Sequence, residues 1–152
     1  MENKEHAIER LNSLLRGELS AVETYQQALK RIGEDADGVQ LRQLHHDHIE
    51  AANMLRTHVH QYGGEPEHGS GAWGLFAQAI ERTASLIGNT AAMKALRAGE
   101  ERGVKDYERA LQELDIPPES QLLIRSDLLP RTRTHVHVLE RLMTECENAA
   151  RT

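Results

Sequence analysis

The sequence predicts an all-α protein, an antiparallel four-helix bundle, and three observations support this. Apolar residues recur at the seven-residue spacing of a buried helix face in four long segments. Glycine and proline residues separate these segments. The apolar residues are mostly leucine and alanine, and only 3% of all residues are aromatic. This composition favours packed helices over a β-sandwich, which would draw on Val, Ile, Tyr and Phe.

The first two helices are expected at residues 4–32 and 39–62. The first ends at Gly33, which opens a short polar turn. The second ends at Gly63-Gly64, because glycine readily adopts the left-handed conformation that closes many helices. The turn between the two helices is short, so they are expected to pack together as a helical hairpin.

The second half of the chain is expected to form another hairpin. Its first helix should cover residues 91–114. Its second should open at Pro117-Pro118, where proline is suited to a first helical turn, and continue to about residue 149. Before this hairpin, a shorter helix is expected at residues 72–87. The apolar face of that short helix consists of Trp73, Phe76, Ile80, Ala84 and Ile87.

The connection between the two hairpins decides the predicted topology. About 25 residues separate the second long helix from the third, and the short helix alone spans about 24 Å at 1.5 Å per residue. The connector is therefore long enough to cross from one end of the bundle to the other. Two hairpins joined by one long crossover form the ferritin-like arrangement. Residues 1–152 are expected to be a single domain, and the exposed face of the short helix is expected to support a homodimer.

The chain also repeats part of itself at a constant offset of 82 residues. GELSAVETYQQAL begins at Gly17 and matches GEERGVKDYERAL, which begins at Gly99. Two unrelated helices would match by chance mainly at Leu and Ala positions. A chance match that also includes the Gly-Glu pair and the Tyr is less expected. An internal duplication of a hairpin is the simplest account, and it predicts pseudo-twofold symmetry. The identical pairs are Gly17/Gly99, Glu18/Glu100, Val22/Val104, Tyr25/Tyr107, Ala28/Ala110 and Leu29/Leu111.

Each inward-facing stripe is apolar except at one position. The seven-residue spacing gives the stripes Leu11, Glu18, Tyr25, Ile32; Leu41, His48, Leu55, Tyr62; Met93, Glu100, Tyr107, Leu114; and Leu128, His135, Leu142. The four exceptions are therefore Glu18, His48, Glu100 and His135. Two isolated buried carboxylates would cost several kcal/mol unless they were neutralised or paired. Histidine partners and a divalent cation would both meet that need.

A metal site and a purely polar network are the two interpretations of these four residues. Carboxylate and imidazole ligands from facing helices suit zinc or iron, and manganese less well. His45 lies one turn before His48 on the same face and is a candidate fifth ligand. Alternatively, the glutamates and histidines pair only with one another inside a structural bundle. No catalytic residue is identified.

Residues beside the four are expected to have other roles. Tyr25 and Tyr107 lie two turns beyond the glutamates and are expected to be core residues whose hydroxyls find a partner. Asp47, Glu50 and Glu101 are rotated off the stripes and are expected to face solvent. Pro130 precedes His135 and should kink or loosen the fourth helix. His58, His60 and His68 are expected at the surface.

Composition limits the partners and the location. The formal net charge of −6 argues against nucleic-acid binding. No segment has the length of a membrane span, and the N-terminal residues do not resemble a secretory signal. The lone cysteine, Cys146, fits a reducing compartment, so a cytoplasmic protein is expected.

Several motifs resemble the ferritin-like superfamily. LLRGELSAVETY is similar to the first metal-binding helix of the bacterioferritins, which implies that Glu18 is the terminal carboxylate ligand. GEERGVKDYERAL resembles their third helix and implies a carboxylate role for Glu100. THVHVLERL resembles their fourth helix and implies a histidine-ligand role for His135. Nearly all of the chain is similar to a bacterial family of uncharacterised ferritin-like four-helix proteins, which share the His-rich second helix and the GGEP stop.

The resemblance also implies that the site is reduced. Di-iron members carry Glu-x-x-His on the second and fourth helices, whereas Thr132 stands in place of the glutamate before His135. On the second helix, either His45 or His48 occupies the carboxylate position, and in the latter case Ala51 occupies the histidine position. We therefore expect a metal-binding protein with a mononuclear, zinc-like site. The alternatives are a structural or stress-related bundle without catalysis and a di-iron oxidoreductase or ferroxidase.

Overall fold

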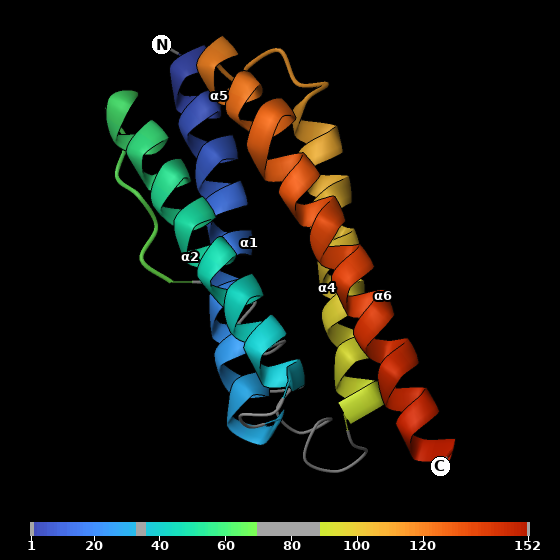
Figure 1. The fold of residues 1–152 in the computed structure, drawn as a ribbon. Coiled ribbons are helices and arrows are strands. Elements are labelled where there is room, and N and C mark those ends of the chain that lie inside the picture. Colours follow the sequence, from blue (N-terminus) through green and yellow to red (C-terminus); the bar gives the residue numbers. More distant parts are fainter. Residues whose placement is uncertain (1, 33–35, 70–88, 152) are drawn as a thin grey trace.

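The protein is all-α in the computed structural model, which describes residues 2–32, 36–69 and 89–151 (Figure 1). These ranges contain no β-strand. The described ranges form four long helical segments, and the last of these is interrupted by a π-helical turn, η2. The elements are α1 Glu2–Ile32, α2 Ala36–Gln61, α4 Asn89–Ala110, α5 Pro118–Leu123, η2 Ile124–Leu128 and α6 Leu129–Arg151. The predicted short helix at 72–87, with its proposed dimer surface, lies outside the described residues.

Contacts between helices follow a consistent order. Tyr107 donates a hydrogen bond to Glu18, and Tyr25 donates one to Glu100, so partner numbers fall along α4 as they rise along α1. α1 packs mainly against α2, and α4 against α6. The N-terminus and α5 lie at one end of the molecule and the C-terminus at the other (Figure 1). Within the described ranges, no helix combines the length and hydropathy needed to cross a membrane.

The buried stripes form two separate apolar clusters. One cluster includes Leu11, Leu15 and Leu55, and the other includes Leu41 and Leu142. Each of the four polar stripe positions lies between residues of the first cluster and residues of the second along its own helix. The four polar residues therefore lie between two apolar layers, and each of them is at most 6% exposed.

One inward-facing position was predicted wrongly. Leu114 is 98% exposed, because α4 ends at Ala110 and the chain leaves the helix through a tight turn. In that turn, the backbone N–H of Glu113 donates to the carbonyl of Ala110 at 3.1 Å. Ile116 is buried instead, with only 1% exposure.

The irregularity predicted near Pro130 is the π-helical turn η2. The backbone N–H of Leu129 donates to the carbonyl of Ile124, five residues earlier, so one extra residue is accommodated before the proline. Pro130 lacks an N–H and cannot continue the regular ladder. The turn leaves both Leu128 and His135 buried. The helix therefore accommodates Pro130 while its inward-facing residues stay buried.

Candidate metal centre

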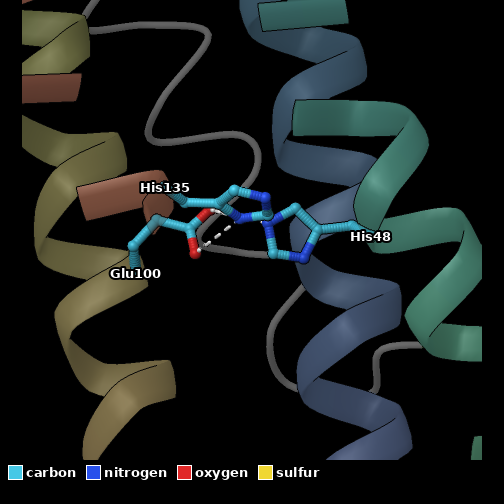
Figure 2. A group of neighbouring side chains, drawn as sticks. All are labelled: His48, Glu100 and His135. Atoms are coloured by element: carbon cyan, nitrogen blue, oxygen red, sulfur yellow. Dashed lines mark hydrogen bonds and ion pairs between the residues drawn. The ribbon is translucent and has the colours of Figure 1, made fainter. Parts of the chain in front are cut away.

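The structure brings the four polar stripe residues together in the core. Glu18 comes from α1, His48 from α2, Glu100 from α4 and His135 from α6, and each is at most 6% exposed. Three of them are drawn in Figure 2, where the carboxylate of Glu100 faces the two imidazole rings. One ligand atom from each of His48, Glu100 and His135 lies within 4.8 Å of the others. The convergence of these side chains follows from one inward position on each helix.

His48 lies between two glutamates. Its Nδ1 is 2.5 Å from Oε2 of Glu18, and its Nε2 is 2.6 Å from Oε1 of Glu100. An imidazole donates from both nitrogens only when it is protonated. Burial alone would lower the pKa of His48, but the carboxylates of Glu100 and Glu18 outweigh burial and hold this pKa well above its ordinary value of 6.5. In the metal-free protein, His48 is therefore a cation between two carboxylates.

Glu100 is the most connected member of the cluster. Besides His48, its carboxylate oxygens lie 3.3 and 3.4 Å from Nδ1 of His135. Burial alone would raise the pKa of Glu100, but the positive charge of His48 and hydrogen bonds from both histidines hold it well below its ordinary range. Glu100 is therefore a carboxylate at neutral pH, although it is only 4% exposed.

Two tyrosines complete the pairing of the glutamates. The hydroxyl of Tyr25 on α1 donates to Glu100 on α4 at 2.7 Å, and the hydroxyl of Tyr107 on α4 donates to Glu18 on α1. Burial, followed by the nearby carboxylates, raises the pKa of both hydroxyls well above 10.0. The prediction that they are core residues with hydrogen-bond partners is confirmed. Each tyrosine therefore donates to the glutamate that belongs to the other half of the sequence repeat.

Asp47 was predicted wrongly to face solvent. Its Oδ2 lies 2.9 Å from Nε2 of His135, and its side chain is only 22% exposed. Arg131 reinforces this position by donating to the backbone carbonyl of Asp47 and to Glu50. α2 packs against both α1 and α6. Asp47 lies one position before His48 on α2 and therefore reaches His135 on α6. Glu101 is exposed, as predicted.

His45 is not part of the converging group formed by His48, Glu100 and His135. It is half-buried, and its Nε2 has no hydrogen-bond partner among the described residues. Burial, and then the neighbouring charge of His48, lower the pKa of His45 below 6.5. The structure places a neutral imidazole one turn from the cluster.

The positions at which the sequence departs from the di-iron pattern carry no carboxylate in the structure. Ala51 is 2% exposed within an apolar cluster. The hydroxyl of Thr132 donates to the carbonyl of Leu128 in its own helix at 2.7 Å. The core therefore offers two glutamates and two imidazoles, with Asp47 on the outer nitrogen of His135.

Comparison with known proteins identifies a family of unknown function. Residues 6–113 match the family described as domain of unknown function (DUF2383). The chain belongs to this family. No curated protein and no solved structure matches the chain. The DUF2383 match covers α1, α2 and α4 and therefore Glu18, His48 and Glu100, and it ends before His135.

The pKa shifts of His48 and Glu100 define the pH range in which their ion pair stabilises the metal-free DUF2383 protein. The raised pKa of His48 gives stability that is fully present below pH 6.5 and is lost as pH rises through the folded-state pKa. The lowered pKa of Glu100 gives stability that is present above pH 4.5 and is lost as pH falls through its folded-state pKa. The pair therefore contributes fully between these two values.

We expect this ion pair to give the metal-free protein a pH-dependent stability that a His48→Gln variant lacks. Above pH 6.5, the free energy of unfolding of the wild type should fall by about 1.4 kcal/mol per pH unit relative to the variant, because only the folded state retains the proton. Urea unfolding at several pH values up to about 8.5, with a chelator present, measures the difference. Equal slopes for the two proteins would contradict the assignment of a protonated His48.

Proposed function

We propose that this DUF2383 protein binds a divalent metal ion in its core, with Glu18, His48, Glu100 and His135 as ligands. The observation that carries the proposal is the buried convergence of His48, Glu100 and His135, whose ligand atoms lie within 4.8 Å of one another. Glu18, the fourth proposed ligand, is outside this group of three and lies 2.5 Å from Nδ1 of His48, the nitrogen opposite the one that faces Glu100. Histidine nitrogen and carboxylate oxygen are common ligands of zinc and iron.

A mononuclear, zinc-like site is the form we favour. Zinc in proteins commonly takes four ligands from histidine, cysteine and carboxylate side chains. The core supplies two imidazoles and two glutamates, which matches that number. A divalent cation would replace the proton of His48 as the positive charge between Glu18 and Glu100, so binding should release protons and weaken at low pH.

We further propose that the helices have the ferritin-like arrangement. Partner numbers run in opposite order along α1 and α4, as the Glu18–Tyr107 and Tyr25–Glu100 contacts illustrate. They also run in opposite order along α2 and the last helical segment, where Asp47 contacts His135 and His58 contacts Ser120. These orders support two antiparallel hairpins whose inner helices α2 and α4 are parallel, joined by a crossover.

The main competing function is a structural bundle whose polar core pairs only with itself. The hydrogen bonds of Tyr25 and Tyr107 to the glutamates support this alternative, because they show that the carboxylates have protein partners. Metal analysis of protein purified without a chelator separates the two functions. We expect close to one equivalent of zinc or iron per chain. Less than about a tenth of an equivalent, unchanged after incubation with zinc or ferrous iron, would contradict metal binding.

A di-iron oxidoreductase or ferroxidase is the third function, and the donor set argues against it. Such centres in ferritin-like bundles use about four glutamates and two histidines, whereas Ala51 and Thr132 stand at positions that could have supplied further ligands. Asp47 adds a carboxylate only at the outer nitrogen of His135. Adding ferrous iron to the protein should therefore cause no oxygen consumption above the protein-free rate.

Asp47 is expected to be a positioning residue for His135. Its carboxylate accepts a hydrogen bond from Nε2 and leaves Nδ1 directed at Glu100 and the proposed metal. Asp47→Ala should lower zinc affinity by roughly 10- to 100-fold, as loss of such outer partners does elsewhere. Competition with a chromophoric chelator measures the affinity. Gln43→Ala, which removes the other side-chain partner of the same carboxylate, serves as the control and should leave affinity unchanged.

A further inference from the structure

A cavity between α1 and α4 extends outward from the candidate metal centre, and Glu18, His48 and Glu100 are part of its lining. It encloses about 330 Å³, which is within the usual size range of small-molecule sites. α1 contributes residues from Arg10 to Tyr25 to its wall, and α4 contributes residues from Leu96 to Arg109. Glu18 and Glu100 lie at its inner end, and exposed Arg102 and Arg109 are among the residues that line it.

Small residues keep this space open. A Cβ atom added at Gly17 would meet no atom within 4 Å, so this glycine does not serve close packing between helices. Gly64 shows the opposite case, because a Cβ there would lie 2.5 Å from the side chain of Ile8. Ser13 and Ala21 also line the cavity on α1. The cavity is partly open to solvent, so a small molecule can enter it from the surface.

The chemical character of the lining points to an anion with an apolar body. Four arginines line the cavity in a protein whose net charge is −6, together with three acids: Glu18, Glu100 and Asp106. Asp106 pairs with Arg109 at 3.8 Å. Arg10 is held by Glu113 at 2.5 Å, and Arg16 by Glu9 and Glu67 at 3.2 and 2.9 Å. These partners of Arg10 and Arg16 do not line the cavity themselves. A guanidinium group has five N–H donors, so each ion pair leaves donors for a ligand. Apolar lining comes from Leu14, Ala21 and Leu96.

We propose that the cavity binds a small organic oxyanion, a carboxylate or phosphate monoester, with its charged group on the arginines. Guanidinium groups recognise both anions through paired hydrogen bonds. The hydrocarbon part of the ligand packs against the apolar wall and approaches Glu18 and Glu100. The anion binds through the arginines and needs no metal, although the pocket shares Glu18, His48 and Glu100 with the proposed metal centre.

The pocket is tested by measuring binding of benzoate, phenyl phosphate and uncharged benzyl alcohol to the metal-free protein by isothermal titration calorimetry. At least one of the two anions should bind at concentrations up to about 10 mM, and benzyl alcohol should bind roughly tenfold more weakly. The stronger anion identifies which oxyanion the site prefers. Failure of both anions to bind, or equal binding of benzyl alcohol, would overturn the proposal.

A Gly17→Leu variant shows whether the anion occupies this cavity. The open space at Gly17 admits the larger side chain, which should weaken anion binding by roughly tenfold or more. Ala98→Leu adds a side chain at an exposed position of α4 outside the cavity and should leave anion binding unchanged. Thermal unfolding confirms that both variants fold. Anion binding that Gly17→Leu does not weaken would place the anion elsewhere and overturn the proposal.

Zinc titration of the same variants separates this proposal from the metal function. Gly17→Leu should keep the zinc stoichiometry of the wild type, because Gly17 offers no ligand atom. Anion binding without zinc binding would support the pocket and contradict the metal centre. Zinc binding without anion binding would support the metal centre and contradict the pocket.

Discussion

Replacing Glu100 with glutamine is expected to abolish zinc binding in the core. Glu100 contacts His48, His135 and Tyr25, so it links both proposed imidazole ligands. Glutamine keeps the size of the side chain and can still accept the hydrogen bond of Tyr25, but it carries no charge to attract a cation. Zinc affinity should fall by roughly 100-fold or more, as measured by chelator competition.

The same variant should also lose its stabilisation by metal. Zinc at about 100 times the dissociation constant should stabilise the wild type by about 2.7 kcal/mol, and it should leave the melting temperature of Glu100→Gln unchanged. Glu101→Gln is the matched control, because Glu101 is the exposed neighbour on the same helix. If Glu100→Gln bound zinc as tightly as Glu101→Gln, Glu100 would not be a ligand.

Replacing His48 with leucine is expected to destabilise the metal-free protein strongly. His48 provides the cation between Glu18 and Glu100, and all three side chains are buried. Removing one partner of a buried ion pair leaves an uncompensated charge and typically costs about 3–5 kcal/mol. Urea unfolding at neutral pH with a chelator present measures the loss.

A charge-neutral background tests the cause of that loss. The triple variant His48→Leu, Glu18→Gln, Glu100→Gln removes all three charges and should recover stability to within about 1 kcal/mol of the Glu18→Gln, Glu100→Gln double variant. If His48→Leu cost as much in the neutral background as in the wild type, the loss would come from packing rather than from charge.

The helices and their inward positions could be predicted because both follow from local sequence. Seven-residue spacing placed Glu18, His48, Glu100 and His135 on four buried stripes, and the structure buries all four side chains. Leu114 followed the same spacing and was predicted wrongly, because a helix end depends on the turn that follows as well as on periodicity. The match to a domain of unknown function agrees with the expectation of an uncharacterised family, and the ferritin-like relationship stays a prediction.

Features that depend on how helices pack could not be predicted from one stripe at a time. Asp47 reaches His135 because α2 and α6 lie side by side, and periodicity alone places Asp47 off the buried face. His48 contacts both Glu18 and Glu100, and this depends on the spacing between α1, α2 and α4. The cavity exists because small residues such as Gly17 face no side chain of the opposite helix. Predicting it would require the positions of both helices.

The location of zinc in a crystal of the protein tests the central claim most directly. Anomalous diffraction at the zinc absorption edge, on crystals grown with zinc, reports where the ion binds. We predict one site in the core, bonded to His48, Glu100 and His135 at about 2.0–2.2 Å. Zinc found only on exposed histidines such as His60 or His68, with none in the core, would contradict the claim that this DUF2383 protein binds metal through its buried glutamates and histidines.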